Sequence, residues 1–393
     1  MTPRTTEAPA ARIPPEVTSA LDYELLAQRT LAGPHHAYVA GGAGHDVTVA
    51  ANRQAFSHWS VVPRVLRDLR AGHVRTTVAG QAWAHPIALA PVAFQRLAHP
   101  DAEIATARAA AATDTCLVAS TLSNATLEAM AQAGGSTARR WFQLYFQPRR
   151  DDTLDLVRRA EAAGYGAIVV TADAAIQMPS RRALHAGFQM PADCVPGNLT
   201  GHAAAPAPDL QPGQSRVFQG AMAWAPRRDD LQWLLAHTRL PVWVKGVLHP
   251  DDATALKDAG AAGVIVSNHG GRSLDGAPAT LQMLPAVRAA VGPTYPVLLD
   301  SGIRSGTDVF KAIALGADAV LIGRLQIYAL SVAGALGVAH MLQLLGEELQ
   351  ACMAQAGCAT VADIRAAALV AAAVPGSPAD ALLSPTPSPC LPC

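Results

Sequence analysis

The sequence has little charge and no surplus of either sign. Only 15% of its 393 residues are charged, and 30 basic side chains are balanced by 30 acidic ones. A chain with that balance lacks the electrostatic footprint that attracts phosphate backbones or anionic lipid surfaces. We therefore expect no nucleic-acid partner and no membrane partner that is held by charge.

Cysteines and long apolar runs are also scarce. The 6 cysteines lack the density and spacing of a disulfide framework, and the opening stretch MTPRTTEAPAARIPPE has no apolar signal core. The longest apolar stretch, from Leu325 to Ala339, is shorter than the ~20 residues that a membrane-spanning helix needs. Cys390 and Cys393 form one CxxC, but no second pair or histidine cluster accompanies it, so it predicts no metal site. These features predict a reduced, cytoplasmic protein without a membrane span.

What the sequence does have is eight short runs of β-branched and aliphatic residues. They begin at Ile87, Cys116, Phe142, Ala167, Pro241, Gly263, Pro296 and Ala319. Ala-rich segments with helical spacing lie between most of them, and continuous apolar runs that alternate with helices indicate parallel strands buried on both faces. Eight such units predict a (β/α)8 TIM barrel, an α/β fold whose active site lies at the carboxyl ends of the strands.

Spacing and composition also divide the chain. We expect a flexible N-terminus over residues 1–21, one barrel over 22–363 that begins with a helical segment, and a disordered Ala/Pro-rich tail over 364–393. The gap between the fourth and fifth runs is much longer than the others and holds an insertion of about 178–225. A loop of that length is either functional or disordered, and we favour an active-site lid over a mere surface excursion.

Polar side chains follow nearly every run, and in a barrel these positions form one surface. The residues at the eight successive strand ends are Pro91, Val92 and Ala93; Ser120; Gln143 and Tyr145; Thr171 and Asp173; Lys245; Ser267, His269 and Arg272; Asp300, Ser301, Gly302 and Arg304; and Gly323 and Arg324. A barrel that is only a scaffold does not need polar groups at so many of these positions. The surface therefore indicates a ligand or catalytic site.

The last two strand ends favour a phosphate. Gly302 and Arg304 precede a helix that begins near Ser305, and Gly323 and Arg324 follow the next strand. Free backbone N–H groups, a helix N-terminus and two guanidinium groups form an anion site, which barrels often place here. The alternative is an ordinary helix cap with an arginine in a surface ion pair.

Three further residues suggest chemistry. His269 lies in a glycine-containing loop with Arg272 three residues on, which suits a general base beside a guanidinium that binds a carboxylate. Asp173 either orients that imidazole or caps a helix. Lys245 ends an apolar strand, so it either forms a Schiff base or provides a fixed positive charge beside an electron-accepting cofactor.

Longer motifs connect these positions. They are YVAGGAG from Tyr38, ANRQAF from Ala51, APVAFQRLAHPDAE from Ala90, WFQLYF from Trp141, SNHGGRSLDGAPATL from Ser267, and PVLLDSGIRSGTDVFKAIALGADAVLIGR ending at Arg324. From about Asp22 to Asp363 the chain resembles the FMN-dependent 2-hydroxy-acid oxidase and dehydrogenase family. That family includes glycolate oxidase, lactate oxidase, mandelate dehydrogenase and hydroxymandelate oxidase.

The resemblance implies a cofactor, a tetrameric assembly and a role for each matching residue. FMN is the implied cofactor and a 2-hydroxy acid the implied substrate. On the substrate side, His269 would be the base paired with Asp173, Arg272 and Arg182 would bind the carboxylate, and Tyr38 and Tyr145 would hydrogen-bond the substrate. On the flavin side, the ring would contact the backbone at Pro91, Val92 and Ala93 and the side chains of Ser120, Gln143, Thr171 and Ser267, with Lys245 near N1 and O2. Asp300 and Ser301 would lie at the ribityl chain, with Gly302, Arg304, Gly323 and Arg324 at the phosphate.

Three departures from the family pattern matter. Ser301 stands where the family usually has glycine, which is tolerable if φ there stays negative. An extra residue after Thr171 leaves open whether Arg181 replaces Arg182 as the clamp. Leu122 stands where glycolate oxidase has tryptophan, and the segment from Ala90 looks most like hydroxymandelate oxidase, so we expect a pocket for a bulky or aromatic side chain. Alternatively, Phe94 or the lid refills the space and leaves a lactate-sized pocket.

The function expected is oxidation of an L-2-hydroxy acid to the 2-keto acid with reduction of O2 to H2O2. A dehydrogenase of the same family that uses a quinone or cytochrome is the nearest alternative. The absence of a preceding haem domain, the lack of a long apolar run in the lid and the alanine at Ala93 argue against it. A Schiff-base lyase using Lys245 and a non-catalytic flavin-binding protein are alternatives from other classes.

Overall fold

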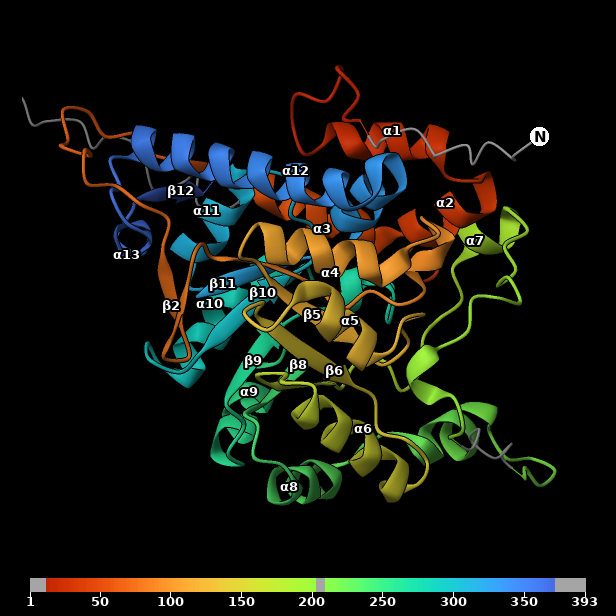
Figure 1. The fold of residues 1–393 in the computed structure, drawn as a ribbon. Coiled ribbons are helices and arrows are strands. Elements are labelled where there is room, and N and C mark those ends of the chain that lie inside the picture. Colours follow the sequence, from red (N-terminus) through yellow and green to blue (C-terminus); the bar gives the residue numbers. More distant parts are fainter. Residues whose placement is uncertain (1–11, 203–208, 372–393) are drawn as a thin grey trace, which may run out of the picture.

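Eight parallel strands close into a barrel in this computed structural model, which describes residues 12–202 and 209–371 (Figure 1). Around the barrel the strand order is β10-β11-β4-β5-β6-β7-β8-β9. The strands are β4 (Ile87–Leu89), β5 (Cys116–Ser120), β6 (Arg140–Leu144), β7 (Ile168–Thr171), β8 (Val242–Val247), β9 (Gly263–Val266), β10 (Val297–Asp300) and β11 (Ala319–Ile322). Each coincides with one of the eight apolar runs, so the predicted (β/α)8 fold is confirmed.

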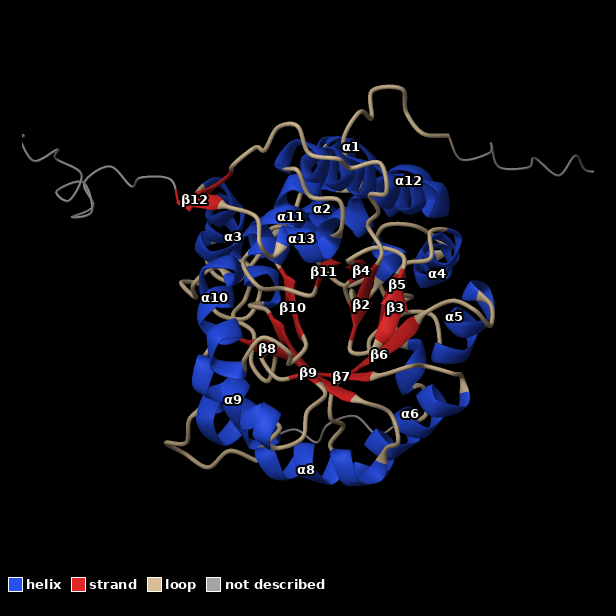
Figure 2. Ribbon diagram, turned by 90° about the vertical axis from the view of Figure 1, so that its left-hand side faces the viewer, coloured by secondary structure: helices blue, strands red, loops and turns tan. Residues whose placement is uncertain are grey.

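Helices surround the barrel on its outside (Figure 2). They are α4 (Ala102–Ala112), α5 (Leu127–Gly134), α6 (Arg150–Ala162), α8 (Arg228–His237), α9 (Pro250–Asp258), α10 (Thr280–Val291), α11 (Gly306–Ala314) and α12 (Arg324–Ala356). Their apolar faces and the outward side chains of the strands form the larger hydrophobic core. The inward side chains form a second, smaller core inside the barrel. Burial on both faces explains why the strands are apolar without alternation.

Between residue 12 and the first barrel strand the structure has three helices, in agreement with the predicted N-terminal helical segment. They are α1 (Asp22–Thr30), α2 (Gly33–Ala40) and α3 (Val47–Ser57). Helix α1 packs on α12, and α3 packs on α10 and on the turn His269–Gly271 that follows β9. The segment before the barrel therefore reaches the carboxyl end of the strands.

The order of the C-terminal region extends past the predicted boundary. We expected disorder from residue 364, but α13 (Val361–Ile364) is followed by β12 (Leu369–Ala371), which pairs antiparallel with β1 (Trp59–Val61). The backbone hydrogen bonds to β1 order this stretch, and the Pro-rich composition begins only after it. Residues 372–393, with the CxxC, and residues 1–11 lie outside the described residues.

The amino-terminal end of the barrel is closed by aromatic rings. The hairpin of β2 (Thr76–Val78) and β3 (Gln81–Trp83) brings Trp83 to within 5.5 Å of Trp141, whose ring lies 4.9 Å from that of Trp243 (centroid distances). On the neighbouring strand a Cβ at Gly263 would lie 2.2 Å from the Trp243 ring, so only glycine leaves room for it.

The insertion after β7 contains short helices rather than an unstructured loop. They are α7 (Arg181–His185) and the one-turn segments η2 (Gly197–Leu199), η3 (Arg216–Gly220) and η4 (Ala221–Trp224). Asn198 fastens it to the barrel, because its Nδ2 donates to the Ser120 carbonyl (3.2 Å) and its Oδ1 accepts from the Leu127 N–H (2.8 Å). Its role as a lid stays a prediction.

Helix α12 contains the longest apolar stretch of the sequence. The apolar stretch at its start is short, but the helix runs for 33 residues and is, by length and composition alone, apolar enough to cross a membrane. A kink at Ala333 and Gly334 interrupts its helical geometry. Half of its most apolar window is buried, and the helix packs on α1, α4 and α11. Packing within the helical layer therefore accounts for its composition.

Candidate active site

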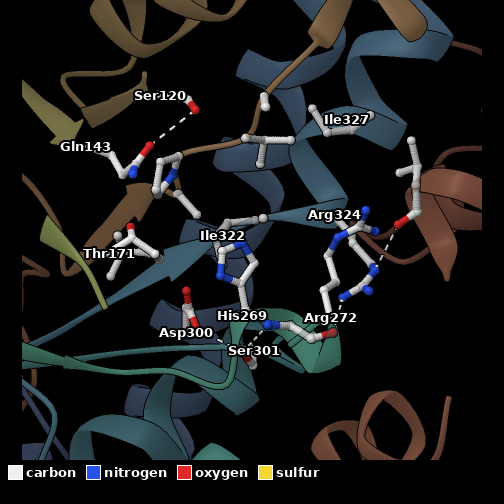
Figure 3. Close-up of a pocket in the computed structure, with 18 of the residues that line it drawn as sticks. Ser120, Gln143, Thr171, His269, Arg272, Asp300, Ser301, Ile322, Arg324 and Ile327 are labelled. Carbon is white, nitrogen blue, oxygen red and sulfur yellow. Dashed lines mark hydrogen bonds between the residues drawn. The ribbon is translucent and has the colours of Figure 1, made fainter. Parts of the chain in front are cut away.

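A cavity opens at the carboxyl ends of the barrel strands. All but three of the predicted site residues line it, and the three exceptions are Asp173, Ser267 and Arg182. Figure 3 shows side chains from the carboxyl ends of several strands and from the segments that follow them converging on the cavity, among them Gln143, His269 and Arg324. The cavity also has lining residues that the sequence did not single out for the site, chiefly Gln177 from the insertion. No pattern in the sequence marks Gln177, because its position depends on how the insertion folds back.

His269 and Asp173 form a hydrogen-bonded pair. The His269 Nδ1 lies 2.9 Å from Asp173 Oδ1, and the imidazole lines the cavity. No helix begins at Asp173, since α7 starts at Arg181 and is capped by Ser180, so the helix-cap interpretation of Asp173 is wrong. Burial tends to raise the pKa of Asp173, but the hydrogen bond and charge of His269 outweigh it and the pKa is lowered. An ionised Asp173 holds the Nδ1 side of the ring and leaves Nε2 for the cavity.

The backbone around this pair is specialised. His269 has φ +58, in the left-handed region that non-glycine residues rarely adopt. Gly246, at an irregularity in the pairing of β8, has φ +100, and a Cβ there would lie 2.5 Å from the Asp173 carboxyl carbon. Only glycine at this position leaves space for the Asp173 carboxylate.

Arg272 is held rigidly at the mouth. Its Nη1 donates to the carbonyl oxygens of Tyr38 (2.8 Å) and Gly41 (3.0 Å). The guanidinium carbon also lies 4.8 Å from the centroid of the Tyr38 ring, a cation–π contact. An arginine fixed in this way is preorganised to meet an anionic ligand.

The second predicted clamp does not reach the cavity. Arg182 lies on α7 and pairs with Asp46, with both Nε and Nη2 at 2.7 Å from Oδ2, and its side chain is 49% exposed. Arg181 is also exposed, and its main-chain N–H donates to the Gly44 carbonyl. A parallel bridge between Gly44 and Ser180 docks α7 onto the turn before α3, which keeps both arginines at the rim. A clamp role for either one stays a prediction.

Lys245 is the buried cation at the floor of the cavity. Its Nζ lies 2.9 Å from Asp300 Oδ2 and donates to Ser267 Oγ at 2.8 Å. Burial tends to lower the pKa of Lys245, but the Asp300 and Asp173 carboxylates outweigh it and raise the pKa. A lysine that stays protonated is a poor nucleophile, so the geometry disfavours the Schiff-base hypothesis.

Beyond Lys245 the cavity becomes electropositive. Arg324 donates to the carbonyls of Val39, Gly270 and Gly41, and its pKa is lowered to about 10 by burial and by the charges of Arg272 and Arg304. Arg304 also lines this end, and its Nε pairs with Glu24 Oε2 at 2.8 Å, so its role at a phosphate stays a prediction. A buried guanidinium whose hydrogen-bond partners are carbonyl oxygens favours an anion at this end of the cavity.

Glycine keeps this end open. A Cβ at Gly302, where φ is +91, would lie 2.3 Å from the Asn52 carbonyl oxygen. A Cβ at Gly323 would have only Ala90 Cβ within 4 Å, so it would project into open space beside the two arginines. The site is thus shaped to let a phosphate approach the backbone closely. Ser301 just before it has φ +80, so the condition under which serine would replace glycine without strain is not met.

The opposite wall fits a flavin ring. Gln143 Oε1 accepts from Ser120 Oγ (3.3 Å) and from the Thr121 N–H (3.2 Å), which fixes the amide orientation. Its Nε2 is buried and has no hydrogen-bond partner among the described residues. An unsatisfied amide donor, a buried cation and an anion site in one cavity match the acceptors, the reducible ring and the phosphate of FMN.

The comparisons agree with this geometry. The family described as FMN-dependent dehydrogenase matches residues 27–371. The chain is 69% identical over 359 residues to an L-lactate oxidase of Alicycliphilus denitrificans, covering 91% of this chain and 97% of that protein. It is 44% identical over 349 residues to a 4-hydroxymandelate oxidase of Amycolatopsis orientalis, and the match covers 88% of this chain and 96% of that protein.

A solved structure is similar as well. A crystal structure of mandelate oxidase superposes with a TM-score of 0.81 at 41% identity, covering 90% of this chain and 99% of the other. The geometry and these relatives confirm the family and the cofactor that the sequence motifs implied. The chain belongs to the FMN-dependent dehydrogenase family, and it is an FMN-dependent (S)-2-hydroxy-acid oxidase.

Proposed function

We propose that the enzyme oxidises L-lactate, or an L-2-hydroxy acid of similar size, to the 2-keto acid and passes the electrons through FMN to O2, forming H2O2. The relative at 69% identity is an L-lactate oxidase, whereas the 4-hydroxymandelate oxidase is 44% identical. This proposal replaces the expectation of a bulky or aromatic substrate and takes up its alternative, the lactate-sized pocket.

The observation that supports a small pocket is the position of Phe94. Phe94 and Leu122 both line the cavity, and the Phe94 N–H donates to the Leu122 carbonyl at 3.3 Å. Phe94 has φ +56, a strained conformation for an aromatic residue. This conformation and the hydrogen bond to Leu122 fix the Phe94 backbone in the cavity wall. A phenyl group on the same wall as Leu122 would refill the space that a missing tryptophan would otherwise leave.

The residues at the mouth would divide the reaction among them. Arg272 binds the substrate carboxylate, and the hydroxyls of Tyr38 and Tyr145 orient the substrate. His269 takes the proton of the substrate hydroxyl on Nε2, and Asp173 stabilises the imidazolium that forms. FMN, when bound, would accept the α-hydrogen of the substrate together with its two electrons, and the positive charge of Lys245 would favour the reduced flavin.

Arg182 would complete the carboxylate site. Its partner Asp46 carries the same functional group as the substrate, so a bound 2-hydroxy acid competes with Asp46 for the guanidinium. Transfer of Arg182 from Asp46 to the substrate would draw α7 inward over the cavity. Helix α7 would then act as a lid that closes when a carboxylate is bound.

Substrate profiling with an oxygen electrode tests the proposal. We expect kcat/KM for L-lactate to exceed that for glycolate and for (S)-mandelate, with D-lactate inactive. Phe94→Ala should raise kcat/KM for mandelate relative to lactate by about 10-fold or more, since apolar contacts discriminate at roughly 1–3 kcal/mol. Ile327→Ala, on α12, is the matched control, because it removes an apolar side chain from the cavity lining without opening the wall of Phe94 and Leu122. A wild-type preference for mandelate over lactate would refute the small pocket.

A further inference from the structure

Ser301 is the residue directly after β10, and its conformation is costly. Its φ of +80 is one that glycine adopts without strain and serine rarely adopts. The side chain has two partners from two strand ends: its Oγ donates to Asp300 Oδ1 (2.8 Å) and accepts from the Gly270 N–H (3.1 Å). Figure 3 shows Asp300 and Ser301 next to each other at the base of the cavity. A strained residue with two such bonds points to a function for the hydroxyl.

The hydroxyl acts on a carboxylate whose other oxygen faces the buried cation. Asp300 Oδ2 lies 2.9 Å from Lys245 Nζ, and Lys245 and Asp300 are only 4% and 6% exposed. A donor on Oδ1 draws negative charge away from Oδ2, so Asp300 neutralises less of the charge on Lys245. In a buried, low-dielectric site this polarisation passes along the hydrogen-bonded groups.

The same hydroxyl joins that pair to the loop of His269. Lys245 donates to Ser267 Oγ (2.8 Å), which in turn accepts from the His269 N–H (3.1 Å), and Gly270 donates to Ser301. Together with the peptide link between His269 and Gly270, these hydrogen bonds form a closed ring from strand β10 through β8 to the loop after β9. Ser301 is the one member of the ring whose side chain both donates to the carboxylate and accepts from the loop.

We propose that Ser301 is a positioning residue that raises the reduction potential of bound FMN by drawing charge from Asp300 and leaving Lys245 the stronger cation. The inference rests on FMN as the cofactor and on Lys245 lying beside the part of the flavin that becomes anionic. It does not depend on which 2-hydroxy acid is oxidised, so a substrate preference other than lactate leaves it untouched.

Two variants separate the hydroxyl from the backbone. Ser301→Ala keeps the Cβ and its strain but loses both hydrogen bonds, whereas Ser301→Gly loses the hydrogen bonds and relieves the strain. The readout is the midpoint potential of the bound FMN, measured by equilibration with redox dyes. We expect both variants to shift the two-electron reduction equilibrium about 3- to 10-fold toward the oxidised flavin, a fall of roughly 15–30 mV.

Thr280→Val is the matched control. Thr280 Oγ1 donates to the main-chain carbonyl of Asp300 (2.6 Å) and not to its carboxylate, so its loss should leave the potential unchanged. Thermal unfolding of the FMN-bound protein gives a second readout, in which the glycine variant should be more stable than the alanine variant because glycine adopts a positive φ without strain. Wild-type potentials in both serine variants, or a shift in the alanine variant alone, would overturn the proposal. Equal shifts in both support it.

Discussion

The two ends of the barrel are built from the same eight strands but from opposite kinds of side chain. At the amino-terminal end, Trp83, Trp141 and Trp243 are each no more than 3% exposed and pack on one another. At the carboxyl end the inward side chains are Lys245, Asp300 and their neighbours, and three non-glycine residues with left-handed backbone, Phe94, His269 and Ser301, line the cavity. Strain of about 1–3 kcal/mol per such residue persists only where the rest of the fold outweighs it. The apolar end therefore stabilises the barrel, and the polar end carries the chemistry at a cost in stability.

The sharpest test of this division is His269→Gln. We expect kcat to fall about 10²- to 10⁴-fold, because removal of a general base has that effect. The melting temperature of the FMN-bound protein should change little, since the amide still reaches Asp173 and the barrel core is untouched. Stopped-flow reduction of the flavin under anaerobic conditions measures the rate directly. Activity close to wild type would show that His269 is not the base.

Trp243→Ala tests the other end. The ring is 1% exposed, and deletion of a buried tryptophan costs about 3–5 kcal/mol of unfolding free energy. Urea unfolding of the apoprotein should show this loss, and Trp243→Phe should lose less because a ring remains. The folded fraction of the alanine variant should still reduce FMN at nearly the wild-type rate. A large fall in that rate would break the separation between the two ends.

The smallest effect that we predict concerns Asp173, which belongs to the active site and also contributes to the stability of the fold. Its folded-state pKa is lowered, so its ionised form contributes stability that is fully present above the unfolded value of about 3.9 and is lost as pH falls through the folded pKa. Asp173→Asn removes this contribution. The unfolding free energy of the variant should therefore fall less steeply than that of wild type as pH drops below about 4. If the unfolding free energies of the two proteins fell equally steeply below about pH 4, the pair of Asp173 with His269 would add nothing to stability.

The sequence predicted what depends on local patterns. Each apolar run became a strand because burial on both faces leaves a continuous signature, and each strand end then fell at the mouth by topology. The pair of His269 with Asp173 follows from that topology and the family motifs. Two features could not be predicted in this way: the contact among the three tryptophans and the pairing of β1 with β12. Both join residues far apart in sequence through contacts that no local pattern encodes.

The site was predicted less completely than the fold. Arg182 was expected at the substrate but pairs with Asp46, since the position of α7 depends on docking to the turn at Gly44. Arg304 lines the cavity, but its ion pair with Glu24, from the helices that precede the barrel, was not predicted. The sign of φ at Ser301 depends on how two strand ends meet. In each case a partner distant in sequence decides the geometry.

The wall around Phe94 and Leu122 has a consequence for the history of such enzymes. Phe94 follows β4, Leu122 follows β5, and Gln177 belongs to the insertion after β7, whereas Gln143, Lys245 and Asp300 lie within the strands themselves. Gene segments that encode connecting loops can diverge or recombine while the strands stay as they are. Enzymes of this kind can therefore change their substrate specificity through the loops, while the strand residues keep the same redox chemistry.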